Sequence, residues 1–320
     1  MSDERLTAAQ AIRSGDRAAI ARAISRIERG DAGDALLESL GAGTRPAYRI
    51  GITGPPGAGK STLTNHLIRG LRSAHATVAV LAVDPSSPYS QGALLGDRLR
   101  MNDIAGDPQV FIRSLATRGA LGGLSAAVAD AATLLDAAGF DYVLIETVGV
   151  GQSEFDIIHV SDTTVVVLTP EAGDEVQIAK AGLLEVADLY VLNKDDRPGS
   201  DAYYAALVAM LEQRRQSKPA DRWAPAIVRT VAEEGRGVAA LLAAIGQHRA
   251  FQEACGAVAG RRRLRRRQRV LQLVPGIVAQ RLWTPSRLEW LQRTLDASDG
   301  TGISVHAVAR RLADDFLASP

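Results

Sequence analysis

The chain has 320 residues, of which 46% are hydrophobic and 23% charged, and its formal net charge is +1 at pH 7. This composition is typical of globular proteins, and the length predicts one large domain with extensions or two domains. The balanced charge gives no global attraction to nucleic acid or membranes, the single cysteine excludes a disulfide framework and a cysteine-based metal site, and the strand-length apolar runs predict no transmembrane helix.

The first 45 residues predict a helical extension. Within residues 5–40, apolar side chains recur at helical spacing between arginines, at Ala18, Ile20, Ile24 and Ile27. The polar N-terminus carries acids and resembles neither a signal peptide nor a transit peptide. Together with the lone Cys255, it predicts a cytoplasmic protein.

Residues 46–252 alternate strand-like and helical patterns. Six apolar runs predict strands, at Tyr48–Thr53, Thr77–Val83, Tyr142–Ile145, Thr163–Thr169, Leu189–Leu192 and Ala226–Thr230. Such alternation predicts the α/β class, with a mostly parallel, doubly wound sheet that helices cover on both faces. Ligands of such sheets bind at the carboxyl ends of the strands, and each motif below follows a strand.

The first motif is a phosphate loop, Gly-Pro-Pro-Gly-Ala-Gly-Lys-Ser, between the first strand and a helical pattern. Its glycines let backbone N–H groups close around nucleotide phosphates, and the helix N-terminus adds partial positive charge. Lys60 can reach the β- and γ-phosphates, and the Ser61 hydroxyl can bind Mg²⁺. The predicted phosphate-binding residues are Gly54, Pro55, Pro56, Gly57, Ala58, Gly59, Lys60, Ser61 and Thr62.

A proline- and serine-rich stretch follows the second strand, beginning Asp84-Pro-Ser-Ser-Pro and leading to Gly-Asp-Arg-Leu-Arg-Met. Asp84 and Asp97 could share the Mg²⁺ shell with Ser61, and Arg100 could stabilise charge on the transferring phosphoryl group. In the alternative interpretation, each acid merely caps a helix. Spacing alone favours neither.

Glu146-Thr-Val-Gly149 follows the strand at Tyr142–Ile145. Most GTPases have aspartate where this chain has Glu146, which would hold Mg²⁺ directly or through water, while the Gly149 N–H would sense the γ-phosphate. The next residue is Val150 rather than a glutamine that positions the attacking water. The sequence therefore predicts slow intrinsic hydrolysis or a catalytic group supplied from elsewhere.

Asn193-Lys194-Asp195-Asp196 follows the fifth apolar run and matches the guanine-reading pattern N-K-x-D. The Asp196 carboxylate can accept hydrogen bonds from the guanine N1–H and exocyclic amine, a donor pair that adenine lacks. The segment Val231-Ala-Glu-Glu-Gly235, after the last strand, is the candidate to close the base pocket, with Val231 and Ala232 as its predicted binding residues. The predicted ligands are therefore GTP and GDP, with Mg²⁺.

Residues 253–320 predict further helices, punctuated by Pro275 and Pro285. Arg261–Arg269 holds seven arginines in nine positions, which opens the alternative of a nucleic-acid-associated GTPase. The balanced net charge and the lack of interleaved aromatic residues disfavour nucleic acid and favour a solvated helix. A metallochaperone GTPase is also disfavoured, because the chain has one cysteine and five dispersed histidines.

Taken together, the motifs resemble those of the MeaB/ArgK-type GTPases, which chaperone adenosylcobalamin-dependent acyl-CoA mutases and whose human counterpart is the methylmalonic aciduria type A protein. The resemblance covers nearly the whole chain. It rests on Asp84–Pro88, Leu95–Met101, Glu146–Glu154, Gly173–Gln177 and Asn193–Asp196. It implies a GTPase domain at 46–252, helical extensions at 1–45 and 253–320, and a homodimer formed largely through the C-terminal extension.

The resemblance also implies GTP hydrolysis coupled to cofactor loading, cofactor repair and protection of the mutase. Its client could be methylmalonyl-CoA mutase, or a 2-hydroxyisobutyryl-, isobutyryl- or ethylmalonyl-CoA mutase. An older family label, an ATPase or kinase for amino-acid transport, conflicts with Asp196. The implied catalytic residues are Lys60, Asp97, Arg100 and Glu146, the implied Mg²⁺ shell is Ser61, Asp84, Asp97 and Glu146, and the implied switch that signals to the mutase is Gly173, Asp174, Glu175, Gln177 and Lys180.

Overall fold

The computed structural model describes residues 2–29, 33–41, 45–85, 104, 106–117, 126–147, 157–170, 187–216, 223–297 and 304–318. The chain divides into two compact units, Met1–Arg262 and Arg263–Pro320. The first unit contains the sheet and all of the sequence motifs up to the start of the arginine run.

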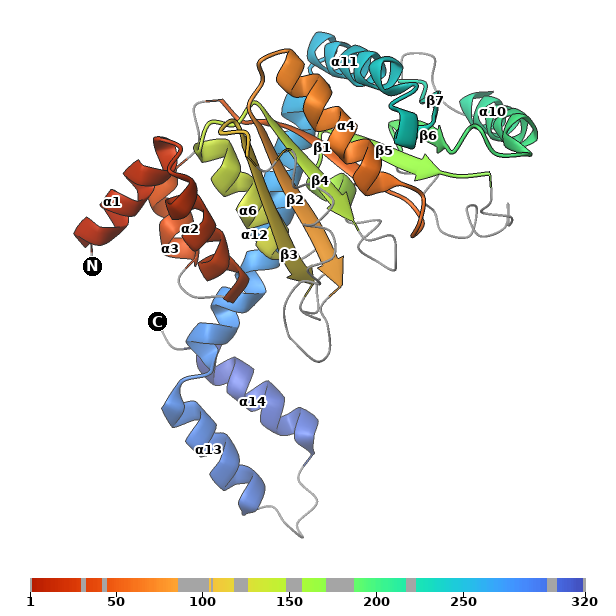
Figure 1. Cartoon of the computed structure of the whole chain (residues 1–320). Helices are drawn as coiled ribbons and strands as arrows, with labels where there is room; N and C mark the ends of the chain where they lie inside the picture. The colour runs from red at the N-terminus through yellow and green to blue at the C-terminus, as the bar shows by residue number, and fades with distance from the viewer. Residues whose placement is uncertain are drawn as a thin grey trace. The chain divides into compact units, whose positions relative to one another are not determined.

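The first unit is built on a seven-stranded parallel sheet in the order β3-β2-β4-β1-β5-β6-β7 (Figure 1). This confirms the predicted α/β class and parallel sheet. The strands are β1 Tyr48–Thr53, β2 Val78–Pro85, β3 Val110–Thr117, β4 Tyr142–Thr147, β5 Thr163–Leu168, β6 Leu189–Asn193 and β7 Ala226–Thr230. Six of them lie at the predicted runs, whereas β3 was not predicted.

Helices cover both faces of the sheet, which explains why the central strands are apolar on both sides. In β4, Leu144 packs into the core under α4 (Lys60–Ser73) and α11 (Val238–Ala254). Its neighbours Val143 and Ile145 pack into the opposite core with α6 (Ala126–Ala137). Figure 1 shows α4 and α11 side by side, and α10 (Ser200–Gln216) covers β5 and β6.

Three N-terminal helices extend the core on the α6 side: α1 (Ser2–Arg13), α2 (Arg17–Arg29) and α3 (Gly33–Leu40). Asp16 caps α2, because its Oδ1 accepts hydrogen bonds from the Ala18 and Ala19 amides at 2.8 and 3.1 Å. The apolar stripe of α2 is buried, as the helical spacing of its isoleucines predicts. Arg113 of β3 binds Glu28 of α2 at 2.9 Å, so an ion pair also fixes α2 to the sheet edge.

The C-terminal helices are α12 (Ala257–Leu282), α13 (Pro285–Asp296) and α14 (Val305–Leu317). Pro285 begins α13 behind its N-cap Thr284, whereas Pro275 lies inside α12 instead of separating two helices. Arginines stack on aromatic rings to join α13 and α14, with Arg287 5.2 Å from Phe316 and Arg311 5.4 Å from Trp290.

Candidate nucleotide-binding site

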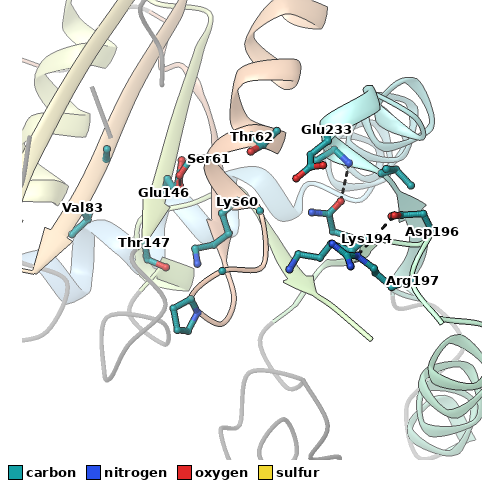
Figure 2. Close-up of a pocket in the computed structure, with 17 residues that line it drawn as sticks. Lys60, Ser61, Thr62, Val83, Glu146, Thr147, Lys194, Asp196, Arg197 and Glu233 are labelled. Atoms are coloured by element: carbon teal, nitrogen blue, oxygen red, sulfur yellow. Dashed lines mark hydrogen bonds and ion pairs between the residues drawn. The ribbon is translucent and has the colours of Figure 1, made fainter. Parts of the chain in front are cut away.

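A cavity of about 380 Å³ opens at the carboxyl edge of the sheet. It brings together the phosphate loop after β1, the end of β4 and the loop after β6, three motifs that lie far apart in the sequence. Figure 2 shows Ser61 beside Glu146 on one side, Asp196 and Arg197 on the other, and Lys60 between them. The residues that line the cavity are Pro56, Gly57, Gly59, Lys60, Ser61, Thr62, Ala82, Val83, Glu146, Thr147, Asn193, Lys194, Asp196, Arg197, Val231, Ala232 and Glu233.

The phosphate loop needs glycine for steric reasons that the structure makes explicit. Gly54 and Gly59 have φ angles of 138° and 86°, in the region that other residues rarely adopt. A Cβ on Gly54 would lie 2.0 Å from the Val167 carbonyl oxygen, and one on Gly59 would lie 2.3 Å from Asn193 Nδ2. Of the predicted phosphate-binding residues, Gly54, Pro55 and Ala58 do not line the cavity.

Lys60 is the first residue of α4. Its buried side chain folds back over the loop, and Nζ donates hydrogen bonds to the Gly54 and Pro55 carbonyl oxygens at 2.8 and 2.9 Å. The ammonium group thus stands inside the loop that would surround the phosphates, with the amino end of α4 directly behind it.

Two hydroxyl groups from α4 hold the Glu146 carboxylate. Ser61 Oγ donates to Oε1 at 2.5 Å, and Thr64 Oγ1 lies 2.9 Å from Oε2. Glu146 belongs to β4, which extends to Thr147 instead of ending at the predicted Ile145. Its side chain is only 7% exposed, so these hydroxyls replace much of its hydration.

The oxygen atoms of Ser61 and Glu146 are the hard ligands that Mg²⁺ prefers. In the part of the chain that the structure describes, no group of three or more His, Cys, Asp or Glu side chains could hold a metal. Mg²⁺ commonly takes one or two protein oxygens and completes its shell with phosphates and water, and the Ser61 and Glu146 oxygens fit that pattern.

Asn193 ties three parts of the site together. Its Nδ2 donates to the Ala58 carbonyl oxygen at 2.8 Å, and its Oδ1 accepts from Thr230 Oγ1 and the Ala232 amide, both at 3.0 Å. It is 2% exposed. Asn193 therefore fixes the phosphate loop, the loop after β6 and the segment after β7 to one another.

The next residues turn sharply out of the sheet. Lys194 has a φ angle of 58°, a left-handed conformation that is uncommon outside glycine. Asp196 lies 4.0 Å from Arg197, and its side chain is 45% exposed at the cavity. Val231 and Ala232, the predicted closing segment, also line this end, at the start of the short helix η3 (Ala232–Glu234).

Several predicted residues lie outside the described part of the chain. Asp84 is described only through its backbone, which pairs with Ala116 near the end of β2, so no contact of its side chain is given. The others are Asp97, Arg100, Gly149, Gly173, Asp174, Glu175, Gln177 and Lys180.

The structure adds residues that the sequence motifs missed. Thr64 follows Ser61 by three positions, so helical periodicity could have placed both hydroxyls on the face toward the Mg²⁺-side acid. No comparable signal marks the cavity residues outside the motifs, which depend on strand register and loop path. These residues are Ala82, Val83 and Arg197.

Comparisons with known proteins agree with this site. The model of the family described as methylmalonyl-CoA mutase-associated GTPase MeaB matches residues 20–287. A Pyrococcus horikoshii protein is 46% identical over 272 residues, 85% of this chain and 86% of that protein. The mouse methylmalonic aciduria type A homolog is 41% identical over 197 residues, 60% of this chain and 46% of that longer protein.

The fold is also that of a solved structure described as a LAO/AO transport system kinase. The two structures superpose with a TM-score of 0.70 and 27% sequence identity, over 99% of each chain. The seven-stranded parallel sheet, the phosphate loop in its cavity and the family match over most of the sequence lead to one conclusion: the chain belongs to the MeaB family and is a phosphate-loop GTPase.

Proposed function

We propose that this GTPase is a chaperone of an adenosylcobalamin-dependent acyl-CoA mutase, with methylmalonyl-CoA mutase as the first candidate client. The observation that carries the proposal is the match to a mutase-associated GTPase family over residues 20–287. The similarity to the mouse methylmalonic aciduria type A homolog supports it. A 2-hydroxyisobutyryl- or isobutyryl-CoA mutase is the alternative client, because the same chaperone chemistry would serve either enzyme.

The cavity supports a guanine nucleotide over adenine. Asp196 would accept hydrogen bonds from the base at one end, with Val231 and Ala232 closing over it. At the other end, Lys60 Nζ would exchange its bonds to the Gly54 and Pro55 carbonyls for β- and γ-phosphate oxygens. The carboxylate of Asp196 also disfavours an ATP-dependent transport kinase.

Ser61 and Glu146, with Asp84 and Asp97, would hold Mg²⁺, which supplies charge neutralisation at the β- and γ-phosphates when bound. Thr64 keeps Glu146 directed at Ser61 through its hydrogen bond of 2.9 Å. Arg100 would stabilise charge on the transferring group, and Gly149 would sense the γ-phosphate. Residues Gly173–Lys180 would report the nucleotide state to the mutase.

We further propose a cytoplasmic homodimer formed through residues 253–320. Large apolar side chains of α12 support this proposal, because they are exposed in the isolated chain. They include Leu264, Leu271, Val274 and Val278. Within the described residues, helices of the length and hydrophobicity needed to cross a membrane do not occur.

The arginine run supports nucleic-acid binding less than its composition implied. Arg261 binds the Asp188 carboxylate at 2.7 and 2.9 Å, and Arg262 lies 3.4 Å from that of Asp162. At least two of the seven arginines are therefore paired with carboxylates of their own unit, which leaves fewer charges for phosphates.

The proposal is tested by measuring GTP turnover of the purified protein alone and with a panel of adenosylcobalamin-dependent acyl-CoA mutases, with ATP as the control nucleotide. We expect slow basal turnover, because Val150 stands where a water-positioning glutamine would be, and strong acceleration by one mutase. Equal turnover with and without every mutase of the panel would contradict the chaperone role. A preference for ATP would contradict the guanine assignment separately.

A further inference from the structure

The variable residue of the N-K-x-D motif, Asp195, is held on three sides. Its Oδ1 accepts hydrogen bonds from Arg229 Nε of β7 and from Ser200 Oγ at the start of α10, both at 2.5 Å. Its amide donates to the Thr230 carbonyl oxygen at 3.1 Å. Asp195 thereby joins the loop after β6 to the neighbouring strand and to the helix that follows.

The Arg229 side chain makes two further contacts at the surface. Its Nη2 lies 2.6 Å from Asp201 Oδ1, and its guanidinium group stacks 5.2 Å from the centre of the Tyr204 ring. Burial alone would raise the pKa of Asp195, but the hydrogen bonds from Ser200 and Arg229 outweigh it and lower that pKa. The carboxylate is therefore ionised at neutral pH, and the contact is a charge-assisted one.

This arrangement matters because Asp196 comes next in the chain. Lys194 holds the left-handed conformation on one side of Asp195, and on the other side the half-exposed Asp196 carboxylate lies at the cavity. The direction of the Asp196 side chain thus depends on the backbone that carries it. Two hydrogen bonds to a planar base edge require that direction to be held closely.

We propose that Asp195 and Arg229 form a positioning pair that sets the affinity and selectivity for guanine by fixing Asp196. The inference rests on the proposed guanine contact of Asp196. Asp195 and Arg229 would act through Asp196 and would not touch the nucleotide themselves, since neither lines the cavity. The competing explanation is a purely structural ion pair that stabilises the fold and leaves base recognition unchanged.

The test compares equilibrium binding of GDP and IDP to the full chain in EDTA, so that Mg²⁺ does not contribute. IDP lacks the exocyclic amine, so the ratio of the two dissociation constants measures how well Asp196 meets that donor. For Asp195→Ala we expect GDP affinity to fall about tenfold and the IDP-to-GDP ratio to fall with it. The general electrostatic gain from removing a negative charge acts on both nucleotides and cancels in the ratio.

The chain offers a matched control at the same arginine. Asp201→Asn removes an ion pair of similar length to Arg229, but the Asp201 side chain is 91% exposed, so water screens that pair. We expect GDP and IDP binding of this variant to stay within about twofold of the unchanged protein. Arg229→Gln should reproduce the Asp195→Ala result, and the double variant should be no worse than either single one.

The possible outcomes separate the explanations. A lowered ratio in Asp195→Ala and Arg229→Gln, with Asp201→Asn unaffected, supports the positioning pair. A lowered melting temperature with an unchanged ratio overturns it in favour of a structural ion pair. If the unchanged protein itself fails to prefer GDP over IDP and ADP, the guanine assignment fails instead. Arg229→Gln also provides the test if Asp195→Ala does not fold.

Discussion

At the scale of single residues, Glu146, the acid proposed to face Mg²⁺, has a hydroxyl partner, Thr64, that no sequence motif includes. Glu146 is nearly buried, and its two carboxylate oxygens meet hydroxyls three positions apart on α4. The Thr64 hydroxyl is also 2.9 Å from the Lys60 carbonyl oxygen, so its single proton is shared between that oxygen and Glu146 Oε2. A carboxylate held in this way is pre-oriented before a metal arrives, as hydrogen bonds around metal ligands commonly achieve.

Replacing Thr64 by valine should therefore weaken the use of Mg²⁺. The change keeps the side-chain volume and removes one hydrogen bond to Glu146 Oε2. We expect the Mg²⁺ concentration for half-maximal GTP turnover to rise about tenfold, in line with the loss of a partner to a metal ligand. Turnover measured across a Mg²⁺ titration checks this, and Thr64→Ser should restore the original midpoint. An unchanged midpoint for valine would show that Ser61 alone orients Glu146.

Asn193 is expected to be as important for stability as for nucleotide binding. Asn193→Ala removes three hydrogen bonds and leaves the Ala58 carbonyl and the Ala232 amide without their observed partner. Since stranded polar groups cost about 1–3 kcal/mol each, we expect about 2–4 kcal/mol less free energy of unfolding. Urea unfolding without nucleotide measures it. A loss of GDP binding at full stability would instead assign Asn193 to the nucleotide alone.

At the scale of elements, apolar runs predicted six of the seven strands. They located these strands and hence the edge where the motifs meet, because the strands are continuous apolar runs. They missed β3, whose apolar run is interrupted by the polar residues Arg113 and Ser114. The edge position alone does not explain the miss, because β7 is the other edge strand and was predicted.

In the site, too, local motifs were predicted and a contact that depends on strand pairing was not. The phosphate loop, Glu146 and Asn193–Asp196 were predicted because their chemistry requires fixed residue types at fixed spacing. The Asp195–Arg229 contact was not, since it depends on the pairing of β6 with β7, where Asn193 lies opposite Thr230. Long-range register of this kind is decided by packing and is not written in any local pattern.

Helix α11 carries a buried histidine that should make stability depend on pH. His248 is fully buried, 2.8 Å from Thr163 Oγ1, 2.9 Å from Gln252 Nε2 and 3.4 Å from Asp188. Burial lowers its pKa, and the charges of Asp188 and Asp162 only partly oppose this. The folded chain therefore takes up this proton at lower pH than the unfolded chain does.

The stability of the folded chain should therefore fall as the pH falls. Below the ordinary histidine pKa of about 6.5, the unfolded chain binds a proton that the folded chain resists, so stability falls as the pH falls. We expect a loss of up to about 1.4 kcal/mol per pH unit between pH 6.5 and the lowered pKa. Urea unfolding at a series of pH values measures the slope, and His248→Gln should remove this contribution. An identical slope in the variant would assign the acid sensitivity to other groups.

Two arginines near the start of α12 should contribute very differently to the stability of the fold. Arg261 neutralises Asp188, whose side chain is 10% exposed, whereas Arg266 is exposed on the same helix. Arg261→Ala should cost about 2–4 kcal/mol of unfolding free energy, less than a fully buried pair because Arg261 itself remains partly exposed. Arg266→Ala should change it by less than about 0.5 kcal/mol. Equal effects in urea unfolding would contradict the distinction between anchoring and solvated arginines.

At the scale of the whole molecule, the two compact units divide between Arg262 and Arg263, inside both α12 and the arginine run. Residues Pro56–Glu233 supply the whole lining of the nucleotide cavity, so it belongs to the first unit alone. The second unit carries large exposed apolar side chains on a helix. The predicted boundaries at residues 45 and 252 stay predictions, and the proposed role of the second unit is assembly.

Assembly through the second unit predicts that a monomeric variant keeps its basal GTP turnover. Leu264, Leu271 and Val278 recur every seven residues along α12, the spacing of helices that pair side by side. We expect the unchanged protein to be a dimer in light scattering and sedimentation, and Leu271→Glu with Val278→Glu to make it monomeric. Basal GTP turnover should persist, because the substitutions lie outside the unit that lines the cavity.

The control for that experiment is Gln280→Glu, which adds a charge to an exposed position of α12 about half a turn away from Val278. It should leave the dimer intact, because it does not enter the apolar stripe. A protein that is monomeric before any substitution, or one that stays dimeric with both glutamates, would contradict assembly through this helix. Loss of basal turnover in a folded monomer would show instead that hydrolysis requires a second copy of the chain.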